Sequence, residues 1–258
     1  MHQKRVYVFL IVLLLTLPAG MLIANNYEGN TTLGGVNGYI TVPSALPVDS
    51  SSGHTTITTG YTAVFSLPSG FSHIPYLQFG FANDFETSLA FDIESNADIL
   101  LSGKWRFLDK NSTSVAFGFI AQALNVGDAV TFGAQTYFAS SFSSTFINWP
   151  SKTTIMLGYT FDGPLNSNID FGMGFQAPLW VQGFKGKVDF LIDFGNVSYS
   201  INPSGGNAEN RGLLNIGLRL LPLEIMRSTF ITADLRLIDI LDATGRAISA
   251  GVSLSFKP

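Results

Sequence analysis

The sequence contains no cysteine and few charged residues. Without cysteine, the chain has no disulfide bonds and no thiolate ligands for a metal ion. Only 12% of its 258 residues are charged, whereas a typical soluble domain has about 25%. A soluble barrel of this size would therefore have too few charges on its surface. The net charge of −4 argues against nucleic acid as a partner.

Residues that carry chemistry are equally scarce. The three histidines are His2, His54 and His73. A hydrolase or acyltransferase needs a nucleophile, a base and an orienting group within hydrogen-bond reach. His73 with Ser69 or Ser72 is the one local pair of this kind, and no carboxylate follows closely in the sequence. We therefore expect no enzymatic activity, no cofactor and no metal site.

Residues 1–24 are typical of an export signal. Lys4 and Arg5 form a basic start, an apolar run follows from Val6 to Leu17, and Leu22-Ile23-Ala24 offers a small-residue cleavage site. The alternative is an uncleaved membrane anchor, but a spanning helix needs about 20 apolar residues. No later segment resembles a transmembrane helix, so strands would have to provide any further membrane insertion.

The stretch from Phe85 to Phe107 shows the pattern that the rest of the chain repeats. Apolar and aromatic side chains alternate with polar ones, and this period of two indicates β-strands. The polar face carries acids on the first strand and bases on the second. Glu86, Asp92 and Glu94 are therefore expected to face Lys104 and Arg106 across the strand pair.

About twelve such segments, each of roughly ten residues, follow one another from Thr55 onward, as in a transmembrane barrel. The fold class is predicted as all-β, an antiparallel up-and-down transmembrane barrel with a polar lumen. Ten strands remain possible if the first pair belongs to the lead-in. Residues 25–53 are predicted as a periplasmic lead-in segment and residues 54–258 as the barrel.

The polar face decides which way the barrel is turned. It is rich in Gly, Ser and Thr rather than Lys and Glu, so it suits a crowded lumen better than a water-exposed surface. A soluble lipocalin-type barrel, with the apolar face inside, is the alternative. The charged residues predicted to line the lumen are Glu86, Asp92, Glu94, Lys104, Arg106, Asp170, Lys187, Asp189, Asp193, Arg219, Asp234 and Arg236. They either pair with one another and keep the lumen narrow, or line a channel that selects ions or glycans.

An even strand count puts both termini on the periplasmic side. Trp105, Trp149 and Trp180 then fall on that same side, where they are predicted to mark the membrane interface. The predicted outer connections include the long stretch Gly195–Asn210.

The last strand, Ser249 to Phe256, resembles the C-terminal signal of bacterial outer-membrane barrels. Gly251, Leu254 and Phe256 occupy its characteristic positions, although this chain continues to Lys257-Pro258. The resemblance implies the outer membrane of a diderm bacterium, with outer-membrane lipid and the barrel-assembly machinery as partners.

The lead-in carries a second resemblance. Gly38-Tyr39-Ile40-Thr41-Val42-Pro43-Ser44-Ala45 is similar to the G-x-I-x-x-P-[ST]-A opening of YjbH-like outer-membrane proteins. This resemblance implies a non-enzymatic role in export of exopolysaccharide or capsule, with polysaccharide-export components as partners. Two alternatives stay open: a narrow passive pore for small solutes or ions, and a surface interaction protein acting through Gly195–Asn210.

Overall fold

The computed structural model describes residues 31–48, 55–66, 70–161, 169–196, 212–241 and 246–257. The predicted signal peptide lies outside the described residues, as do Ser69, His54 and all of the loop Gly195–Asn210 after Asn196.

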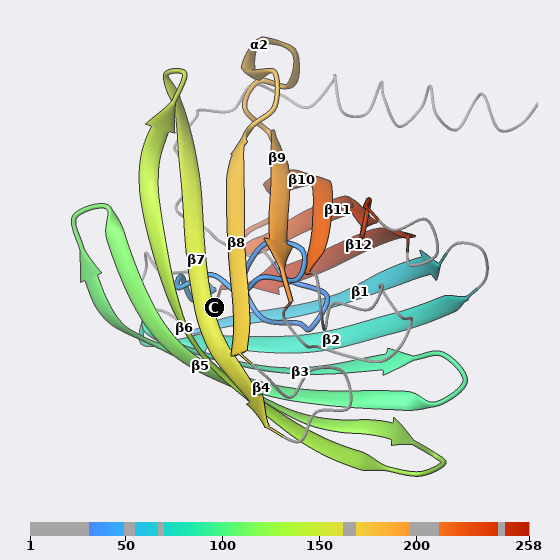
Figure 1. The fold of residues 1–258 in the computed structure, drawn as a ribbon. Coiled ribbons are helices and arrows are strands. Elements are labelled where there is room, and N and C mark those ends of the chain that lie inside the picture. Colours follow the sequence, from blue (N-terminus) through green and yellow to red (C-terminus); the bar gives the residue numbers. More distant parts are fainter. Residues whose placement is uncertain are drawn as a thin grey trace, which may run out of the picture.

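Twelve strands in the described part of the chain form one closed antiparallel barrel, which confirms the predicted fold class and the higher of the two strand counts (Figure 1). The strands are β1 (Thr56–Ser66), β2 (Phe71–Phe81), β3 (Phe85–Ile93), β4 (Ala97–Lys110), β5 (Thr113–Val126), β6 (Thr131–Phe146), β7 (Trp149–Phe161), β8 (Ile169–Pro178), β9 (Val188–Gly195), β10 (Leu213–Met226), β11 (Thr229–Ile238) and β12 (Ala247–Phe256). The helix α2 (Val181–Phe184) lies between β8 and β9.

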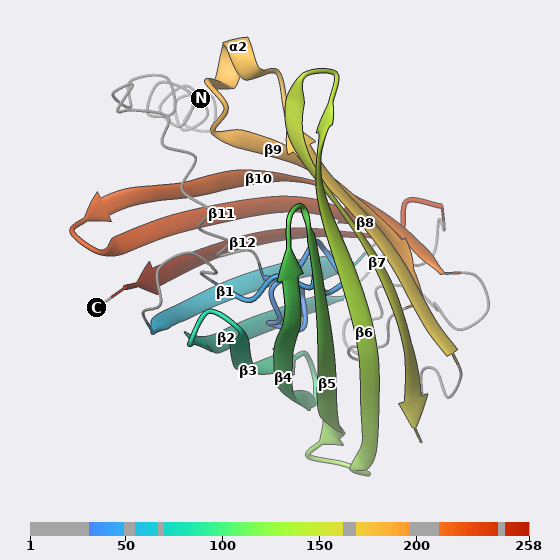
Figure 2. The same cartoon turned by 90° about the vertical axis from the view of Figure 1, so that its left-hand side faces the viewer.

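Each strand pairs with its neighbours in the sequence, and β1 pairs with β12 to close the barrel. The closing register runs from Ile57 opposite Phe256 to Ser66 opposite Ala247. Because the strand number is even, β1 begins and β12 ends at the same end of the barrel. We call this end the terminal rim; the turns at residues 82–84, 111–112, 147–148, 179–187 and 227–228 also lie there (Figure 2).

The strands turn their apolar faces outward. On β3, the side chains of Phe85 and Glu86 are 42% and 3% exposed, and this alternation recurs around the wall. Large apolar side chains on the outside, such as Phe132 and Leu157, would be unfavourable in water but suit a lipid environment. The arrangement is the reverse of the lipocalin-type alternative. In the described part of the chain, no helix is long and apolar enough to cross a membrane.

Residues 31–48 lie inside the barrel, and we call them the plug (the blue segment in Figure 1). All but one of them are buried, among them Leu33, Val36 and Ile40 at 0–1% exposure. Backbone hydrogen bonds within the plug keep it compact. The Leu33 amide donates to the carbonyl of Ile40, and the Tyr39 amide donates to the carbonyl of Val42. The described part of the predicted lead-in thus lies within the lumen.

Candidate functional site: the plug and the lumen wall

Asp193 of β9 holds the centre of the plug. One of its carboxylate oxygens, Oδ2, accepts hydrogen bonds from the backbone amides of Ile40, Thr41 and Val42 at 2.8, 2.7 and 3.0 Å. Its other oxygen accepts one from the side-chain amide of Asn215 at 2.7 Å. Three successive N–H groups that converge on one anion form the type of concave site that binds carboxylates and phosphates. Here the wall supplies the anion and the plug supplies the donors.

Glu86 and Lys104 hold the plug at a second point. Glu86 accepts hydrogen bonds from the amides of Asn37 and Val48 at 2.7 and 2.9 Å. Lys104 donates to the carbonyls of Asn37 and Leu46 at 3.0 and 2.9 Å, and its ammonium lies 3.2 Å from Glu86. The two wall residues lie directly opposite each other on β3 and β4. The opposite charges of Glu86 and Lys104 balance each other. The two side chains also form hydrogen bonds to backbone groups of the plug.

Two arginines bind the carbonyl oxygens of the plug. Arg219 donates to the carbonyls of Gly38 and Tyr39 at 3.0 and 3.1 Å. Arg236 donates to the carbonyl of Thr31 at 2.9 Å. Asp234 lies between the two guanidinium groups, at 2.6 Å from Arg219 and 2.7 Å from Arg236. A planar guanidinium with several fixed donors can bind a carboxylate and carbonyls at once, which a lysine cannot do in the same geometry.

Glycines in the wall provide sockets for large side chains. A Cβ atom added at Gly174 would lie 2.3 Å from the ring of Tyr39, and one added at Gly80 would lie 2.4 Å from Val48. Two wall tyrosines use glycines in the same way, Tyr76 against Gly60 and Tyr137 against Gly118. The mid-strand glycines thus allow the plug and the lumen tyrosines to approach the wall at backbone distance.

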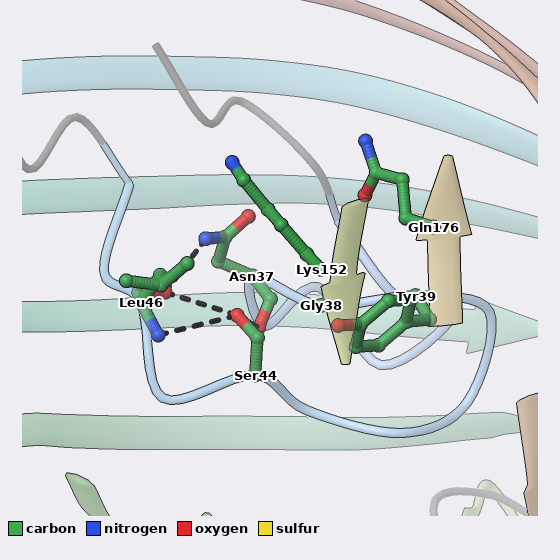
Figure 3. Close-up of a pocket in the computed structure, with 7 residues that line it drawn as sticks. All are labelled: Asn37, Gly38, Tyr39, Ser44, Leu46, Lys152 and Gln176. Carbon is green, nitrogen blue, oxygen red and sulfur yellow. Dashed lines mark hydrogen bonds between the residues drawn. The ribbon is translucent and has the colours of Figure 1, made fainter. Parts of the chain in front are cut away.

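A small polar cavity remains between the plug and strands β7 and β8 (Figure 3). Its lining consists of Asn37, Gly38, Tyr39, Ser44, Leu46, Lys152 and Gln176, and its volume is about 10 Å³, the lower limit for one water molecule. Tyr39 hydrogen-bonds to Thr154 at 3.0 Å, and its burial raises the pKa of its phenol to about 12. The plug therefore fits this part of the wall closely.

Ten of the twelve charged residues predicted to line the lumen fall into three groups. Glu86, Lys104, Asp193, Arg219 and Arg236 form the contacts to the plug described above. Asp234 pairs with the two arginines. Asp92, Asp170 and Asp189 are buried and accept hydrogen bonds from the wall residues Ser72, Thr160 and Gln176. Arg106 forms ion pairs with Asp84 and Asp109, both at 3.0 Å, at the terminal rim.

Glu94 and Lys187 lie apart from these groups. Glu94 is exposed in the turn after β3, and Lys187 is partly exposed in the turn before β9. The expectation that Asp92 faces a base is wrong, because Asp98 lies opposite it on β4. This error has a simple cause: the polar break at residues 94–96 closes a tight turn, which brings the two acids next to that turn into register.

The predicted interface tryptophans all lie toward the terminal rim. Trp105 and Trp180 are 48% and 63% exposed, and Trp149 is partly exposed at the start of β7. Gly251, Leu254 and Phe256 of the predicted assembly signal lie on β12, which is paired along its length with β1 and β11. Their role in assembly stays a prediction.

Ser72 and His73 point to opposite faces of β2. Ser72 is fully buried and donates to Asp92 at 2.5 Å inside the lumen, whereas His73 lies on the outer surface against Tyr61 and Phe71. The two cannot form a nucleophile–base pair. Among the described residues, no group of three or more His, Cys, Asp or Glu side chains is arranged to hold a metal ion.

Several residues that contact the plug could not be predicted from the sequence. Ser141 accepts a hydrogen bond from the Ala45 amide at 2.8 Å, and Asn215 donates to Thr41 at 3.1 Å. Tyr76 accepts a hydrogen bond from the hydroxyl of Thr31 at 2.7 Å. In the sequence these residues are marked only by their place on the polar face. Many residues that do not touch the plug have the same place, so the sequence carries no specific signal for the contact.

A closed twelve-stranded barrel with an apolar outside and a polar interior defines an integral β-barrel of the outer membrane. The solved structures that it resembles are of this class. They include the KdgM porin (TM-score 0.52, 7% identity, 78% of this chain and 99% of that chain) and the NanC porin (TM-score 0.51, 10% identity, 79% and 100%). At these identities the likeness shows the fold alone. No protein-family model and no curated protein matches the sequence.

Proposed function

We propose that this protein is a non-enzymatic outer-membrane channel that its own plug closes at rest. The observation that carries the proposal is the position of residues 31–48, which occupy the lumen and bind charged wall residues through their backbone. In a permanently open pore, Asp193, Glu86 and Arg219 would face water instead of binding a segment that lies across the lumen.

We further propose envelope polysaccharide export as the process that this channel serves. The support is the stretch Gly38–Ala45, whose residues resemble the opening of YjbH-like proteins. Asp193 and Arg219 bind the backbone of this stretch, so it lies where a passing polymer would contact it. Displacement of the plug would leave carboxylates, guanidinium groups and tyrosines along the lumen, groups that hydrogen-bond and pack against sugars.

The test uses a disulfide between plug and wall. The Ala45 amide lies 2.8 Å from the Ser141 hydroxyl, and the natural chain has no cysteine. An Ala45→Cys, Ser141→Cys variant should lock the plug in the oxidising periplasm. The matched control, Ser88→Cys with Ser102→Cys, joins two wall positions that lie opposite each other.

In a strain that lacks the gene, we expect wild type and control to restore extracellular polysaccharide and the locked variant to fail. Equal restoration by the locked variant would contradict plug movement. Unchanged polysaccharide in the deletion strain would reject the export role and leave the closed barrel standing.

A passive pore is the second candidate. It is favoured by the fold shared with KdgM and NanC, which are described as porins, and KdgM has also been solved in complex with oligogalacturonate (TM-score 0.50, 7% identity). This candidate requires a lumen that conducts without displacement of the plug. A steady conductance that the Ala45–Ser141 disulfide leaves unchanged would favour it.

A further inference from the structure

The terminal rim carries exposed basic side chains on several turns. Lys110, Lys185 and Arg227 are exposed, and Lys187 and Lys257 are partly exposed. They come from the β4–β5 turn, the segment after α2, the β10–β11 turn and the chain after β12, so they are distributed around the opening (Figure 2). Lys257 lies over the ring of Phe230, 5.2 Å from its centroid, so an aromatic face partners that base.

Acids do not balance these bases. Asp84 and Asp109 both pair with Arg106, at 3.0 Å each, and so their charges are used within the rim. Glu224 is the further exposed acid of the described terminal rim. The opposite end has the reverse sign, because Glu94 and Asp128 are exposed there and Arg246 is the exposed base of the described residues. Among the described residues, the excess of positive charge thus lies at the terminal rim.

The terminal rim also carries large exposed apolar side chains. Ile147, Trp180 and Met226 are 68%, 63% and 65% exposed. Lys185 directly follows Phe184, and Arg227 directly follows Met226, so an apolar and a basic side chain are neighbours in each of these two segments. Aromatic rings together with basic side chains are typical of segments that lie in the headgroup layer of a membrane. There the rings reach the boundary of the acyl chains and the bases contact phosphate groups.

We infer that the terminal rim binds anionic phospholipid headgroups, of the phosphatidylglycerol type, in the leaflet next to it. β1 begins and β12 ends at this rim, and in barrels of this class that end faces the periplasm, where the adjacent leaflet consists of phospholipid. A single phosphate on each headgroup offers one anionic contact to each base. This inference does not depend on transport by the lumen.

The experiment uses the rim tryptophans as reporters. The full-length protein, with Trp105→Phe to limit the signal to Trp149 and Trp180, is placed in phosphatidylcholine vesicles that contain brominated phosphatidylglycerol or brominated phosphatidylcholine. Bromine quenches tryptophan fluorescence on contact. We expect stronger quenching by the anionic lipid, a preference that falls as salt is raised.

The triple variant Lys110→Gln, Lys185→Gln, Arg227→Gln should lose this preference, by about five-fold for each base removed. Arg246→Gln at the opposite end is the matched control and should retain it. All these positions are exposed, and heat-modifiable gel mobility verifies that each variant folds. Equal quenching by the two lipids in the parent protein, or an unchanged preference in the triple variant, would overturn the inference. Binding of an acidic surface of another protein to the basic rim would then be the alternative to test.

Discussion

The carboxylate of Asp193 lies 2.8 Å from the backbone nitrogen of Ile40, although 153 positions separate the two residues in the sequence. This contact is one of three that join the wall to the plug at the same atom, because the amides of the next two residues also bind this oxygen. Contacts of this kind hold the plug in the lumen, and each can be tested by substitution.

Asp193→Ala should release the plug while the barrel stays folded. Three buried N–H groups would lose their acceptor, at about 1–3 kcal/mol for each group left unpaired. Limited proteolysis in detergent should then cleave within residues 31–48, nearly all of which are buried in the wild type. Asp128→Ala, at an exposed acid in the β5–β6 turn, is the control. Equal protection in both variants would show that Asp193 does not hold the plug.

Gly174→Ala should expel Tyr39 from its socket. The added methyl carbon would lie 2.3 Å from the Tyr39 ring, closer than any tolerated contact, so the ring and the plug backbone must move. Gly251→Ala is the control, because its nearest neighbour is the small Thr62 hydroxyl at 2.9 Å. With both variants refolded in detergent, we expect faster proteolysis of the plug only in Gly174→Ala.

Arg219→Lys should destabilise the folded protein despite the retained charge. A lysine cannot reach Asp234 and the carbonyls of Gly38 and Tyr39 together, so we expect a loss of about 2 kcal/mol. The midpoint of urea unfolding, followed by gel mobility, measures it. Arg246→Lys, at an exposed arginine, should leave the midpoint unchanged, and the same result for Arg219→Lys would count against the network.

Retention of the plug should weaken at high pH. The pKa of Tyr39 is raised from 10.0 to about 12 in the folded protein because the phenol is buried. Between these values a released Tyr39 gives up its proton and a docked one keeps it, so stability is full below pH 10 and falls as pH rises toward 12. The difference amounts to about 3 kcal/mol. The rate of proteolysis of the plug should rise over this pH range in the wild type but not in Tyr39→Phe, whose side chain cannot ionise. Proteolysis rates that depend on pH in the same way in both proteins would show that ionisation of Tyr39 does not weaken the plug.

Much of the wall could be predicted from the sequence, because alternation along a strand is a local property. The side chains of Phe85 and Glu86 point to opposite faces whatever their neighbours are. The scarcity of charge then selects lipid as the outer environment. The plug could not be found in this way. Gly38–Ala45 has no regular period, and its position depends on Asp193 and Arg219, which are remote in the sequence. The facing of Asp92 and Asp98 was also missed, since register depends on where the turn closes.

The current across a planar bilayer tests the central claim most directly. The measured protein carries Ala45→Cys, Ser141→Cys and Asp193→Ala, so that the disulfide holds a plug whose main anchor is absent. Oxidised protein should show no steady current, and a reducing agent should open conducting steps that reoxidation closes. A steady current that is the same before and after reduction would contradict the claim that residues 31–48 close the lumen.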